Sequence, residues 1–275
     1  MKHLVAVSIL TFSLFRFPVH AQNQTRAMPD DNLAYPVLIT LKTGGGSGFY
    51  LNAKTAIYLV TAKHVLFDPN TGKLLDTTFD LWSYSKDLSD STPNSFTVDT
   101  GVVGADSIIR HPSEDVAILK VASVDPNTPG LIHYLPGIIV HTMAKAGILG
   151  VGPDAIKKFN EVLIGNAVIV LGYPTSLGLQ TIPQIDSHRP LLRKGIVAGL
   201  NPGTHSIILD CPVYFGNSGG PVIEVDPEGL GFRFKIIGIV SQYVPYADGG
   251  KTFLIMANSG YSVSTPMDYV LELIK

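Results

Sequence analysis

Ser218 lies in a glycine-rich stretch, Gly216-Asn217-Ser218-Gly219-Gly220-Pro221, whose residue types could support nucleophilic chemistry. A serine hydroxyl becomes a useful nucleophile when a neighbouring base accepts its proton. The attack also creates an oxyanion, which needs backbone N–H donors in a tight loop free of bulky side chains. Gly216 and Ser218 could supply two such donors. Taken alone, the stretch fits a glycine-rich turn between two strands equally well.

The base for such a serine is usually a histidine that the fold holds rigidly. His64 follows an apolar run over residues 56–60, in the stretch Leu59-Val60-Thr61-Ala62-Lys63-His64-Val65. The end of a strand can hold an imidazole firmly while leaving one edge open to a cleft. A single histidine is more often an ordinary surface or core residue, so His64 gains significance only from its partners.

A carboxylate that fixes the tautomer of the histidine would complete this chemistry. Asp115 directly precedes an apolar run over residues 116–121, at the mouth of a predicted strand. Glu114 is the competing choice, and in an extended segment the two side chains point to opposite faces, so only one can serve. We choose Asp115 because the apolar run begins immediately after it. The plain alternative is a carboxylate that merely ends an edge strand.

Short apolar runs separated by Gly, Pro, Asn and Asp predict an all-β fold made of many short strands. The first block of predicted strands covers residues 36–41, 49–51, 56–60, 79–84, 95–99, 106–110 and 116–121. The second block covers residues 167–171, 191–198, 206–209, 221–225, 232–242, 251–254 and 261–264. Residues 43–48, rich in glycine, are expected to form a tight turn. Two blocks of this kind predict two packed β-barrels.

The two blocks define the expected organisation of the chain. Residues 34–121 are predicted to form an N-terminal barrel and residues 166–265 a C-terminal barrel. Residues 122–165 are expected to connect them, with a short helix over residues 153–163, where apolar residues recur at helical spacing. Residues 266–275 are predicted to form a terminal helix, because a proline opens an apolar-periodic run.

Residues 1–21 have the pattern of a signal peptide. Lys2 and His3 form a short basic region, the next residues to Phe15 are mostly apolar, and Val19-His20-Ala21 offers small residues at the positions read for cleavage. The apolar stretch is too short to span a bilayer. We therefore expect export to a periplasm or the cell exterior, no membrane anchor after cleavage, and a flexible lead-in over residues 22–33.

Composition excludes several classes of function. The chain has 20 Lys and Arg against 22 Asp and Glu, without a basic cluster, so nucleic-acid binding is not expected. The single cysteine, Cys211, excludes an internal disulfide and a cysteine-ligated zinc site. We interpret Cys211 as a small buried residue and not as a nucleophile.

The order His64, Asp115, Ser218, each in its own motif, resembles the trypsin-like (chymotrypsin-fold) serine peptidases, in particular the disulfide-free bacterial Deg/HtrA type. The motifs are TAKHV around the histidine, DVAILKV from the aspartate and GNSGGP around the serine. Further matches are Gly48-Phe49, Gly172-Tyr173-Pro174, Gly238-Ile239-Val240-Ser241 and the ending over residues 266–274. The resemblance covers roughly residues 34–274 and is weakest over 122–165.

The resemblance implies a serine endopeptidase that hydrolyses extended or unfolded polypeptide through an acyl-enzyme intermediate. Its site would lie in the cleft between two antiparallel six-stranded barrels, with a short C-terminal helix. His64 would act as general base and then acid, Asp115 would orient it, and Ser218 would attack. The N–H groups of Gly216 and Ser218 would form the oxyanion hole. The resemblance implies no metal and no cofactor, and it leaves the oligomeric state open.

By the same resemblance, Phe215, Ser241, Gln242 and Tyr243 would contact the substrate. Residues 212–215 and 241–243 contain no carboxylate, which disfavours a preference for Lys or Arg, and Tyr243 would narrow the pocket towards small or medium apolar side chains. Asn217 stands where digestive trypsins carry an aspartate, so activation by a new N-terminus is not expected. No PDZ domain is expected after the terminal helix.

Two alternatives compete with this interpretation. A catalytically silent trypsin-fold protein could bind polypeptide in the cell envelope while a displaced loop turns the Gly216 N–H away from the oxyanion hole. The bare Gly-x-Ser-x-Gly pattern around Ser218 also occurs in esterases. The esterase alternative fails because the order of the three catalytic residues is reversed and a strand is predicted to follow the serine.

Overall fold

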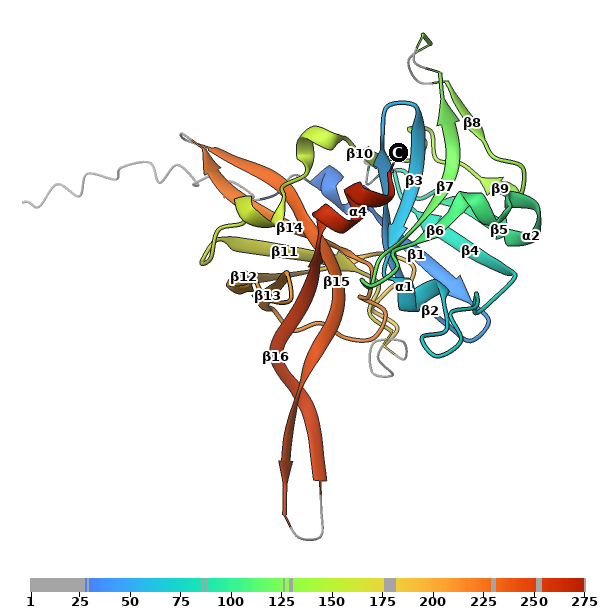
Figure 1. Ribbon diagram of the computed structural model, residues 1–275. Helices are drawn as coiled ribbons and strands as arrows, with labels where there is room; N and C mark the ends of the chain where they lie inside the picture. The colour runs from blue at the N-terminus through green and yellow to red at the C-terminus, as the bar shows by residue number, and fades with distance from the viewer. Residues whose placement is uncertain are drawn as a thin grey trace, which may run out of the picture.

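The computed structural model describes residues 28, 30–85, 87, 89–125, 127–128, 131–175, 182–228, 231–250 and 254–274. The predicted signal peptide and most of the predicted lead-in lie outside these residues. The described chain consists mostly of strands with a short C-terminal helix, which confirms the all-β prediction (Figure 1). Within the described ranges, no helix is both long and apolar enough to cross a membrane.

The first half forms a ten-stranded sheet in the order β6-β7-β3-β2-β1-β4-β5-β9, with β8 paired to β7 and β10 paired to β2. Among the described strand pairs of this sheet, β10 and β2 are parallel and the others are antiparallel. The strands are β1 (Pro36–Leu41), β2 (Gly44–Asn52), β3 (Ala56–Thr61), β4 (Thr78–Ser83), β5 (Asn94–Asp99), β6 (Ile108–Arg110), β7 (Ala117–Val124), β8 (Ile132–Tyr134), β9 (Ile138–Thr142) and β10 (Gly150–Val151). The short helical element η1 (Asp30–Ala34) precedes β1, and α1 (Lys63–Leu66), α2 (Thr100–Val103) and η2 (Ala105–Ser107) lie between the strands.

The second half forms a closed antiparallel barrel of six strands in the order β11-β12-β13-β16-β15-β14. Its strands are β11 (Ala167–Gly172), β12 (Leu191–Asn201), β13 (Ser206–Asp210), β14 (Pro221–Glu228), β15 (Gly231–Gly249) and β16 (Leu254–Pro266), followed by α4 (Met267–Leu273). The strand order of the first half is open. The prediction of two six-stranded barrels is therefore met in the second half, and for the first half it stays a prediction.

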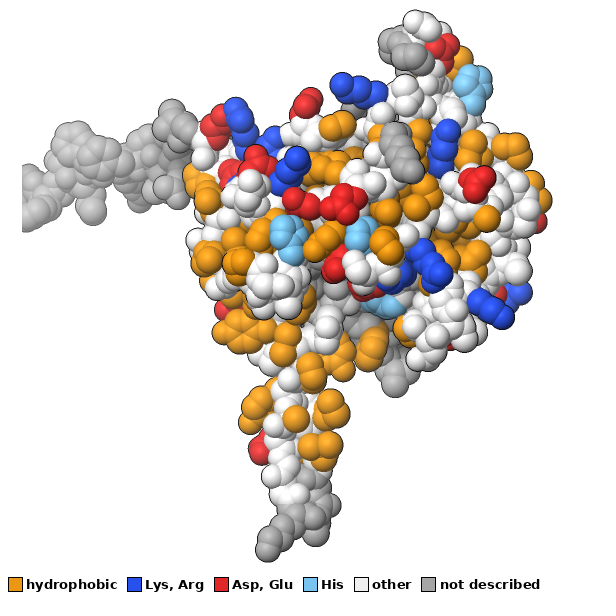
Figure 2. Space-filling model, viewed as in Figure 1, with side chains coloured by type: hydrophobic (Ala, Val, Ile, Leu, Met, Phe, Trp, Pro, Cys, Tyr) orange, Lys and Arg blue, Asp and Glu red, His pale blue; other side chains and the backbone are white. Residues whose placement is uncertain are grey.

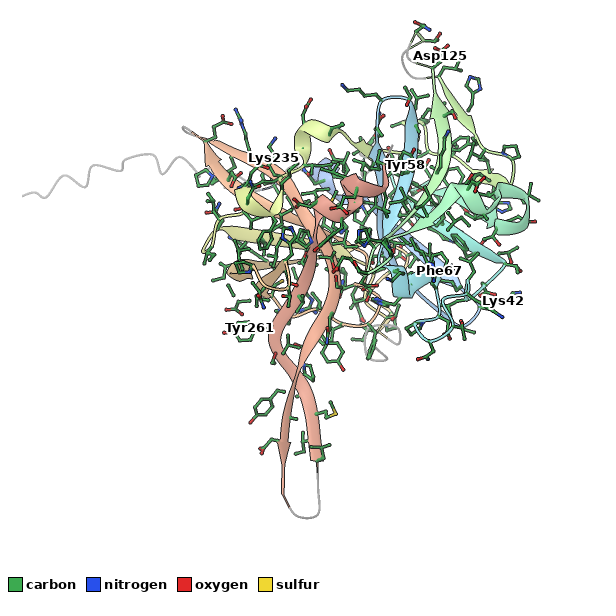
Figure 3. All side chains as sticks on the ribbon, viewed as in Figure 1. Lys42, Tyr58, Phe67, Asp125, Lys235 and Tyr261 are labelled. Atoms are coloured by element: carbon green, nitrogen blue, oxygen red, sulfur yellow. The ribbon has the colours of Figure 1, made fainter. Side chains whose placement is uncertain are left out.

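One hydrophobic core joins the two sheets. Leu59 and Ile118 of the first sheet belong to the same buried cluster as Leu171 and Ile223 of the barrel. The terminal helix α4 adds Met267, Val270 and Leu273 to this cluster, so the predicted helix closes the core at its end. A second, smaller cluster, which includes Val168, Leu209 and Ile237, fills the interior of the barrel. Side chains of both clusters are drawn in Figure 3.

The glycine run predicted as a turn is part of strand β2. Gly44 to Gly48 pair with β1, and only Lys42 and Thr43 form the turn. A Cβ atom on Gly45 would lie 2.2 Å from the carbonyl oxygen of Ile39. The glycines therefore allow a close backbone approach inside the sheet.

The connection over residues 122–165 differs from its prediction. It contributes β8, β9 and β10 to the first sheet, and the helix predicted over residues 153–163 is wrong. These residues form two short 3₁₀ turns, η3 (Pro153–Ala155) and η4 (Phe159–Glu161). Between them, the Lys157 N–H donates to the carbonyl of Ile236 on β15, at 3.0 Å. In a continuous helix this N–H would donate to the carbonyl four residues earlier in the chain, so the bond to Ile236 is incompatible with a helix at Lys157.

A buried ionic cluster fixes the connection to the barrel. Glu224 on β14 is fully buried, and its Oε1 accepts from the Leu163 N–H at 3.1 Å and from Asn166 Nδ2 at 2.8 Å. The Lys157 ammonium lies 2.8 Å from Glu224 Oε2 and 2.9 Å from Asp226 Oδ1. Burial lowers the pKa of Lys157, but its bonds to the two carboxylates outweigh this effect and leave the pKa raised. Lys157 is therefore held as a cation between β14 and the connection.

Strands β15 and β16 extend well beyond the barrel as a two-stranded ribbon (Figure 1). Sequence patterns predicted strands over 251–254 and 261–264, whereas β16 is continuous from residue 254 to 266, and residues 251–253 lie outside the described chain. We refer to residues 243–249 of β15 and 254–261 of β16 as the arm. Figure 3 labels Tyr261 at its root.

Candidate active site

His64 lies in α1, the single helical turn that follows strand β3. Val65 and Leu66 in the same turn are buried, which anchors the turn to the core. The His64 side chain remains 40% exposed. The local sequence thus produces a rigid backbone with an accessible imidazole, as predicted from its position after the apolar strand.

Asp115 contacts His64 at two points. The Oδ1 atom of Asp115 accepts from the His64 backbone N–H at 3.0 Å, and Oδ2 lies 2.7 Å from His64 Nδ1. An ionised carboxylate can only accept hydrogen bonds, so this contact places the ring proton on Nδ1. The other ring nitrogen, Nε2, is then left with a free lone pair that can accept a proton.

His111 shapes the loop that carries Asp115. The Nδ1 atom of His111 accepts from the Glu114 N–H at 2.9 Å, and its backbone N–H donates to the Val116 carbonyl at 2.9 Å. Its backbone carbonyl accepts from Lys63 Nζ at 3.1 Å, beside His64. The other ring nitrogen lies 3.1 Å from a carboxylate oxygen of Glu272 on α4. Sequence reasoning missed His111, because these contacts join segments distant in the chain.

The Ser218 loop, residues 211–220 between β13 and β14, is held closed by the Asn217 side chain and by backbone hydrogen bonds. Asn217, almost fully buried, accepts from the Tyr214 N–H through Oδ1 at 3.0 Å, and its N–H donates to the Tyr214 carbonyl at 3.0 Å. The Gly220 N–H donates to the Asn217 carbonyl at 2.9 Å. Gly216 and Gly219 have φ angles of +88° and +81°, a backbone region in which glycine is favoured.

Ser47 on β2 ties this loop to the first sheet. Its N–H donates to the Ser218 carbonyl at 2.8 Å, and its hydroxyl donates to the Gly216 carbonyl at 2.6 Å. The same hydroxyl oxygen accepts from the Tyr173 N–H at 2.9 Å, while the Ser47 carbonyl accepts from the Thr61 hydroxyl at 2.7 Å. Local sequence patterns did not indicate this role, because Ser47 lies in the glycine run that was expected to form a turn.

The Ser218 loop packs directly against the segment that carries His64. A Cβ atom on Gly46 would lie 2.6 Å from the Val65 side chain and 3.0 Å from the Ser218 carbonyl. A Cβ atom on Gly219 would lie 2.7 Å from the Ala62 backbone nitrogen. His64, Asp115 and the Ser218 loop therefore converge at one place between the two sheets.

The peptide between Phe215 and Gly216 has a defined orientation. The Phe215 carbonyl accepts from the Thr175 N–H at 2.8 Å. The described peptides are all trans, so the Gly216 N–H points away from Thr175, on the other side of the same peptide. Within the described ranges, the N–H groups of Gly216 and Ser218 have no acceptor. Two donors near the serine are thus free to bind an anion.

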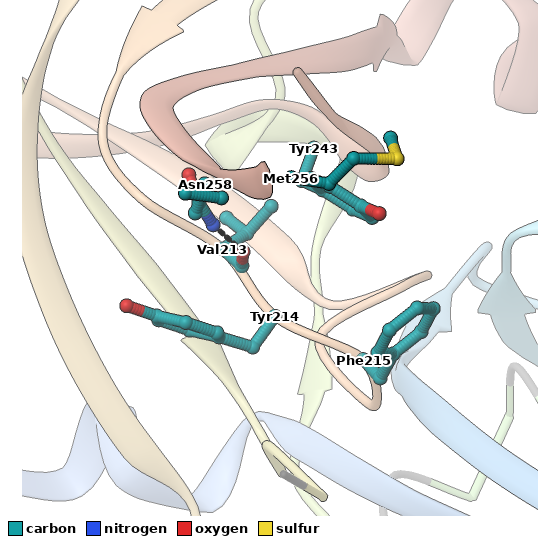
Figure 4. A pocket seen from close by; sticks show the side chains of 7 residues that line it. Val213, Tyr214, Phe215, Tyr243, Met256 and Asn258 are labelled. Atoms are coloured by element: carbon teal, nitrogen blue, oxygen red, sulfur yellow. Dashed lines mark hydrogen bonds between the residues drawn. The ribbon is translucent and has the colours of Figure 1, made fainter. Parts of the chain in front are cut away.

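A pocket of about 200 Å³ opens between the Ser218 loop and the root of the arm (Figure 4). Phe215 and Tyr243, two of the residues predicted to contact substrate, both line it, with ring centroids 5.7 Å apart. Ser241 and Gln242 were predicted with them but lie outside the lining. The hydroxyl of Ser241 is hydrogen-bonded to that of Thr265. The lining is completed by Val213, Tyr214, Met256, Ala257 and Asn258, and it contains no charged side chain.

Residues 256–258 were missed by sequence reasoning. The amide of Asn258 donates to the Val213 carbonyl at 2.6 Å, which joins the arm to the Ser218 loop. The sequence patterns assigned no strand to residues 255–260, and only the pairing of β16 with β15 brings residues 256–258 to the pocket. In the described part of the chain, no group of three or more His, Cys, Asp or Glu residues could hold a metal ion.

Cys211 is fully buried, as predicted, and burial raises the pKa of its thiol to about 11, with Asp210 adding to the effect and Arg193 opposing it. At pH 8, about one thiol in a thousand would be ionised, and the thiolate is the reactive form. We therefore expect almost no alkylation of the folded protein by iodoacetamide at pH 8, but complete alkylation in guanidinium, both followed by intact mass. Rapid alkylation of the folded protein would contradict the buried, inert assignment.

The sequence of this chain is similar to those of known peptidases. Residues 46–231 match the trypsin-like peptidase domain family. Two curated relatives, each a "probable periplasmic serine endoprotease DegP-like", come from Brucella suis biovar 1 (strain 1330) and Brucella abortus biovar 1 (strain 9-941). Each is 28% identical over 191 residues, which cover 70% of this chain and 27% of the relative. The match thus spans little more than a quarter of the curated relatives.

Solved structures with a similar course of the chain include a crystal structure of Deg5, with 20% identity, coverage of 88% of both chains and a TM-score of 0.48. The HtrA-type protease AlgW with a tripeptide has 20% identity and a TM-score of 0.45, over 90% of this chain and 59% of that one. The thermostable serine protease AL20 from an extremophilic microorganism has 14% identity and a TM-score of 0.48. The match covers 89% of this chain and 96% of that one.

Proposed function

The chain belongs to the trypsin-like peptidase family, and from this premise we propose that it is an exported serine endopeptidase acting on extended polypeptide. The observation that carries the proposal is the two-point contact of Asp115 with His64, beside a serine loop with two free N–H donors. Acyl transfer requires a nucleophile, an oriented base and a site that binds the oxyanion, and these residues could supply all three.

The proposed reaction proceeds in two halves. His64 Nε2 takes the proton of the Ser218 hydroxyl as Oγ attacks the carbonyl carbon of the substrate peptide bond. His64 then gives that proton to the departing amine as the C–N bond breaks, which leaves the acyl group on Ser218. Water attacks this ester with His64 again as base, and the acid product and free serine result. Throughout, Asp115 holds the imidazole and stabilises the imidazolium that forms.

The free N–H groups of Gly216 and Ser218 would bind the oxyanion of each tetrahedral intermediate. The alternative function, a silent protein that only binds polypeptide, requires the Gly216 N–H to be turned away. The hydrogen bond from Thr175 to the Phe215 carbonyl supports the open orientation. Hydrolysis is therefore favoured over binding alone.

The uncharged pocket supports a preference for an apolar side chain on the amino side of the cleaved bond. Its walls are contributed by Val213, Phe215, Tyr243 and Met256, and its volume is about 200 Å³. A Lys or Arg side chain would have to leave water without finding an opposite charge there. We propose that residues 1–21 direct export, which agrees with the description of the Brucella relatives as probable periplasmic endoproteases.

The test is intact-mass analysis of residues 22–275 after incubation with a fluorophosphonate, with Ser218→Ala as the matched control. A fluorophosphonate reacts with a serine only where a base and an oxyanion site activate it. We expect one adduct on the parent protein and none on the control. Because Ser218 is only half-buried, its replacement should leave the melting temperature of the control close to that of the parent.

A parent protein that is folded and remains unlabelled would contradict the proposed activity. That outcome would favour the silent binding protein, and the orientation of the Gly216 N–H would then have to be determined in a crystal. Labelling that persists in Ser218→Ala would show that another residue is the nucleophile.

A further inference from the structure

Beyond the pocket, strand β15 has an open edge that begins at the Ser218 loop. The pairing of β14 with β15 ends at Pro221 opposite Ile239, and the final backbone bonds join Val240 to Gly219 and Gly220 at 2.7 and 2.9 Å. From residue 241 to 249, the described strands pair β15 with β16 alone. One edge of β15 is therefore open over roughly 30 Å.

The arm carries apolar side chains that are exposed among the described residues. Tyr246 and Ile255 project from one face of the ribbon and are 54% and 56% exposed. Leu254 and Met256 project from the other face and are 69% and 61% exposed. Asp248 is the only charged residue among the described residues of the arm. Figure 2 shows hydrophobic side chains along the projecting ribbon. A surface of this kind marks a site of interaction.

The root of the arm is also a wall of the proposed active site. Tyr243, Met256 and Asn258 line the pocket beside the Ser218 loop (Figure 4). Asn258 is bonded directly to that loop through the Val213 carbonyl. The surface is therefore continuous from the pocket to the open edge and the exposed apolar side chains of the arm. A polypeptide that occupies the pocket would also contact the arm.

We propose that the arm binds the substrate chain itself, as an extended apolar segment that adds a strand to the open edge of β15. This inference rests on the proposed peptidase function. Strand addition at an exposed edge is a recurring mode of peptide recognition, in which backbone bonds give affinity and side chains give preference. With antiparallel pairing, the more common arrangement, a chain running towards Ser218 places the residues before the cleaved bond on the arm.

The sequence of β15 indicates which backbone groups face the open edge. Pro245 has no N–H to donate, and a proline inside a strand is tolerated where its N–H side faces away from the partner strand. Backbone groups alternate sides along a strand, so Ala247 and Gly249 also face the open edge. Val244 lies at a register shift between β15 and β16, and its carbonyl faces β16, where it accepts from the Ser259 hydroxyl at 2.7 Å.

The test measures binding to the Ser218→Ala protein by fluorescence anisotropy, so that no cleavage is needed. Three fluorescein-labelled peptides share one apolar sequence of about four residues. One peptide has no extension, one carries about eight alternating Val and Thr residues before the shared sequence, and one carries them after it. We expect the peptide with the preceding extension to bind at least about tenfold more tightly than the other two.

Two variants test whether this gain in peptide affinity depends on the arm. Ala247→Pro removes one N–H from the open edge, and Tyr246→Ser removes an exposed side chain from the neighbouring position. In the Ser218→Ala background, each should abolish most of the gain while the affinity for the short peptide and the melting temperature stay unchanged. Ile164→Ser, an exposed apolar residue outside the arm, is the matched control and should keep the gain.

Several outcomes would overturn the proposal. Equal affinity for all three peptides would show that the arm does not bind the substrate chain. A gain that survives both arm variants would place the extension elsewhere. A dimer in sedimentation velocity that dissociates upon Tyr246→Ser would make a second copy of the chain the occupant. Failure of the parent to react with fluorophosphonate would refute the peptidase function separately, since the anisotropy measurement does not depend on it.

Discussion

Replacing Asp115 by asparagine is expected to lower kcat for peptide hydrolysis by about 10⁴-fold, with a much smaller change in KM. The carboxylate accepts both the backbone N–H and the Nδ1 proton of His64. An asparagine amide can donate to Nδ1, which would move the ring proton to Nε2 and remove the lone pair that the serine proton needs. The rate of fluorophosphonate labelling should fall with kcat. Steady-state kinetics on an unstructured polypeptide, together with labelling rates, check both results.

Glu114→Gln is the matched control for this substitution. It changes the adjacent carboxylate, the competing candidate from the sequence, and keeps the backbone N–H that donates to His111 Nδ1. We expect kcat to stay within about threefold of the parent, because the described hydrogen bonds of His64 to a carboxylate go to Asp115 and not to the half-buried Glu114. A large loss in Glu114→Gln combined with an active Asp115→Asn would mean that the acid was wrongly assigned.

Replacing Gly219 by alanine is expected to destroy the site and to destabilise the protein by about 2–5 kcal/mol. The φ angle of +81° costs roughly 1–2 kcal/mol for a residue with a Cβ atom. The new Cβ would also lie 2.2 Å from the Ser47 carbonyl oxygen and 2.2 Å from the Thr61 hydroxyl, and overpacking typically adds about 1–3 kcal/mol. Thermal denaturation should show a melting temperature lower by about 10 °C, and labelling of Ser218 should be lost.

Gly165→Ala separates backbone strain from crowding. Gly165 has a φ angle of +91°, but a Cβ atom added there would meet nothing within 4 Å. The Gly165→Ala substitution should lower the free energy of unfolding only by the cost of the backbone conformation, about 1–2 kcal/mol, and should leave labelling of Ser218 intact. Equal loss of stability in the two variants would show that the contact between the Ser218 loop and β2 is looser than the structure describes.

The residues proposed for catalysis could be predicted because each lies in a short motif of its own. His64 follows an apolar strand, Asp115 precedes one, and Ser218 lies between glycines. Local patterns also predicted most strands and the terminal helix. Such patterns depend on hydrophobic period and turn chemistry, which a few neighbouring residues determine.

The residues that position this site could not be predicted in the same way. Ser47 acts on Gly216, which is 169 residues away, and His111 reaches Glu272 over 161 residues. Residues 256–258 reach the pocket only through the register between β15 and β16. The helix predicted over 153–163 was wrong because a hydrogen bond from Lys157 to a distant strand overrode the local apolar spacing. Tertiary contacts of this kind leave no local signal.

The bonds of Ser47 make assembly of the site conditional on the whole chain. The first sheet supplies His64, Asp115 and the hydroxyl that holds Gly216, while the barrel supplies Ser218. Under the proposed mechanism, neither half would present an activated serine before the two have docked. A newly made chain would then be unable to cleave itself or its neighbours while it is unfolded, which is when it would be the best substrate. Docking of the two halves, to which the Ser47 hydroxyl contributes a direct hydrogen bond, would set the moment at which activity begins.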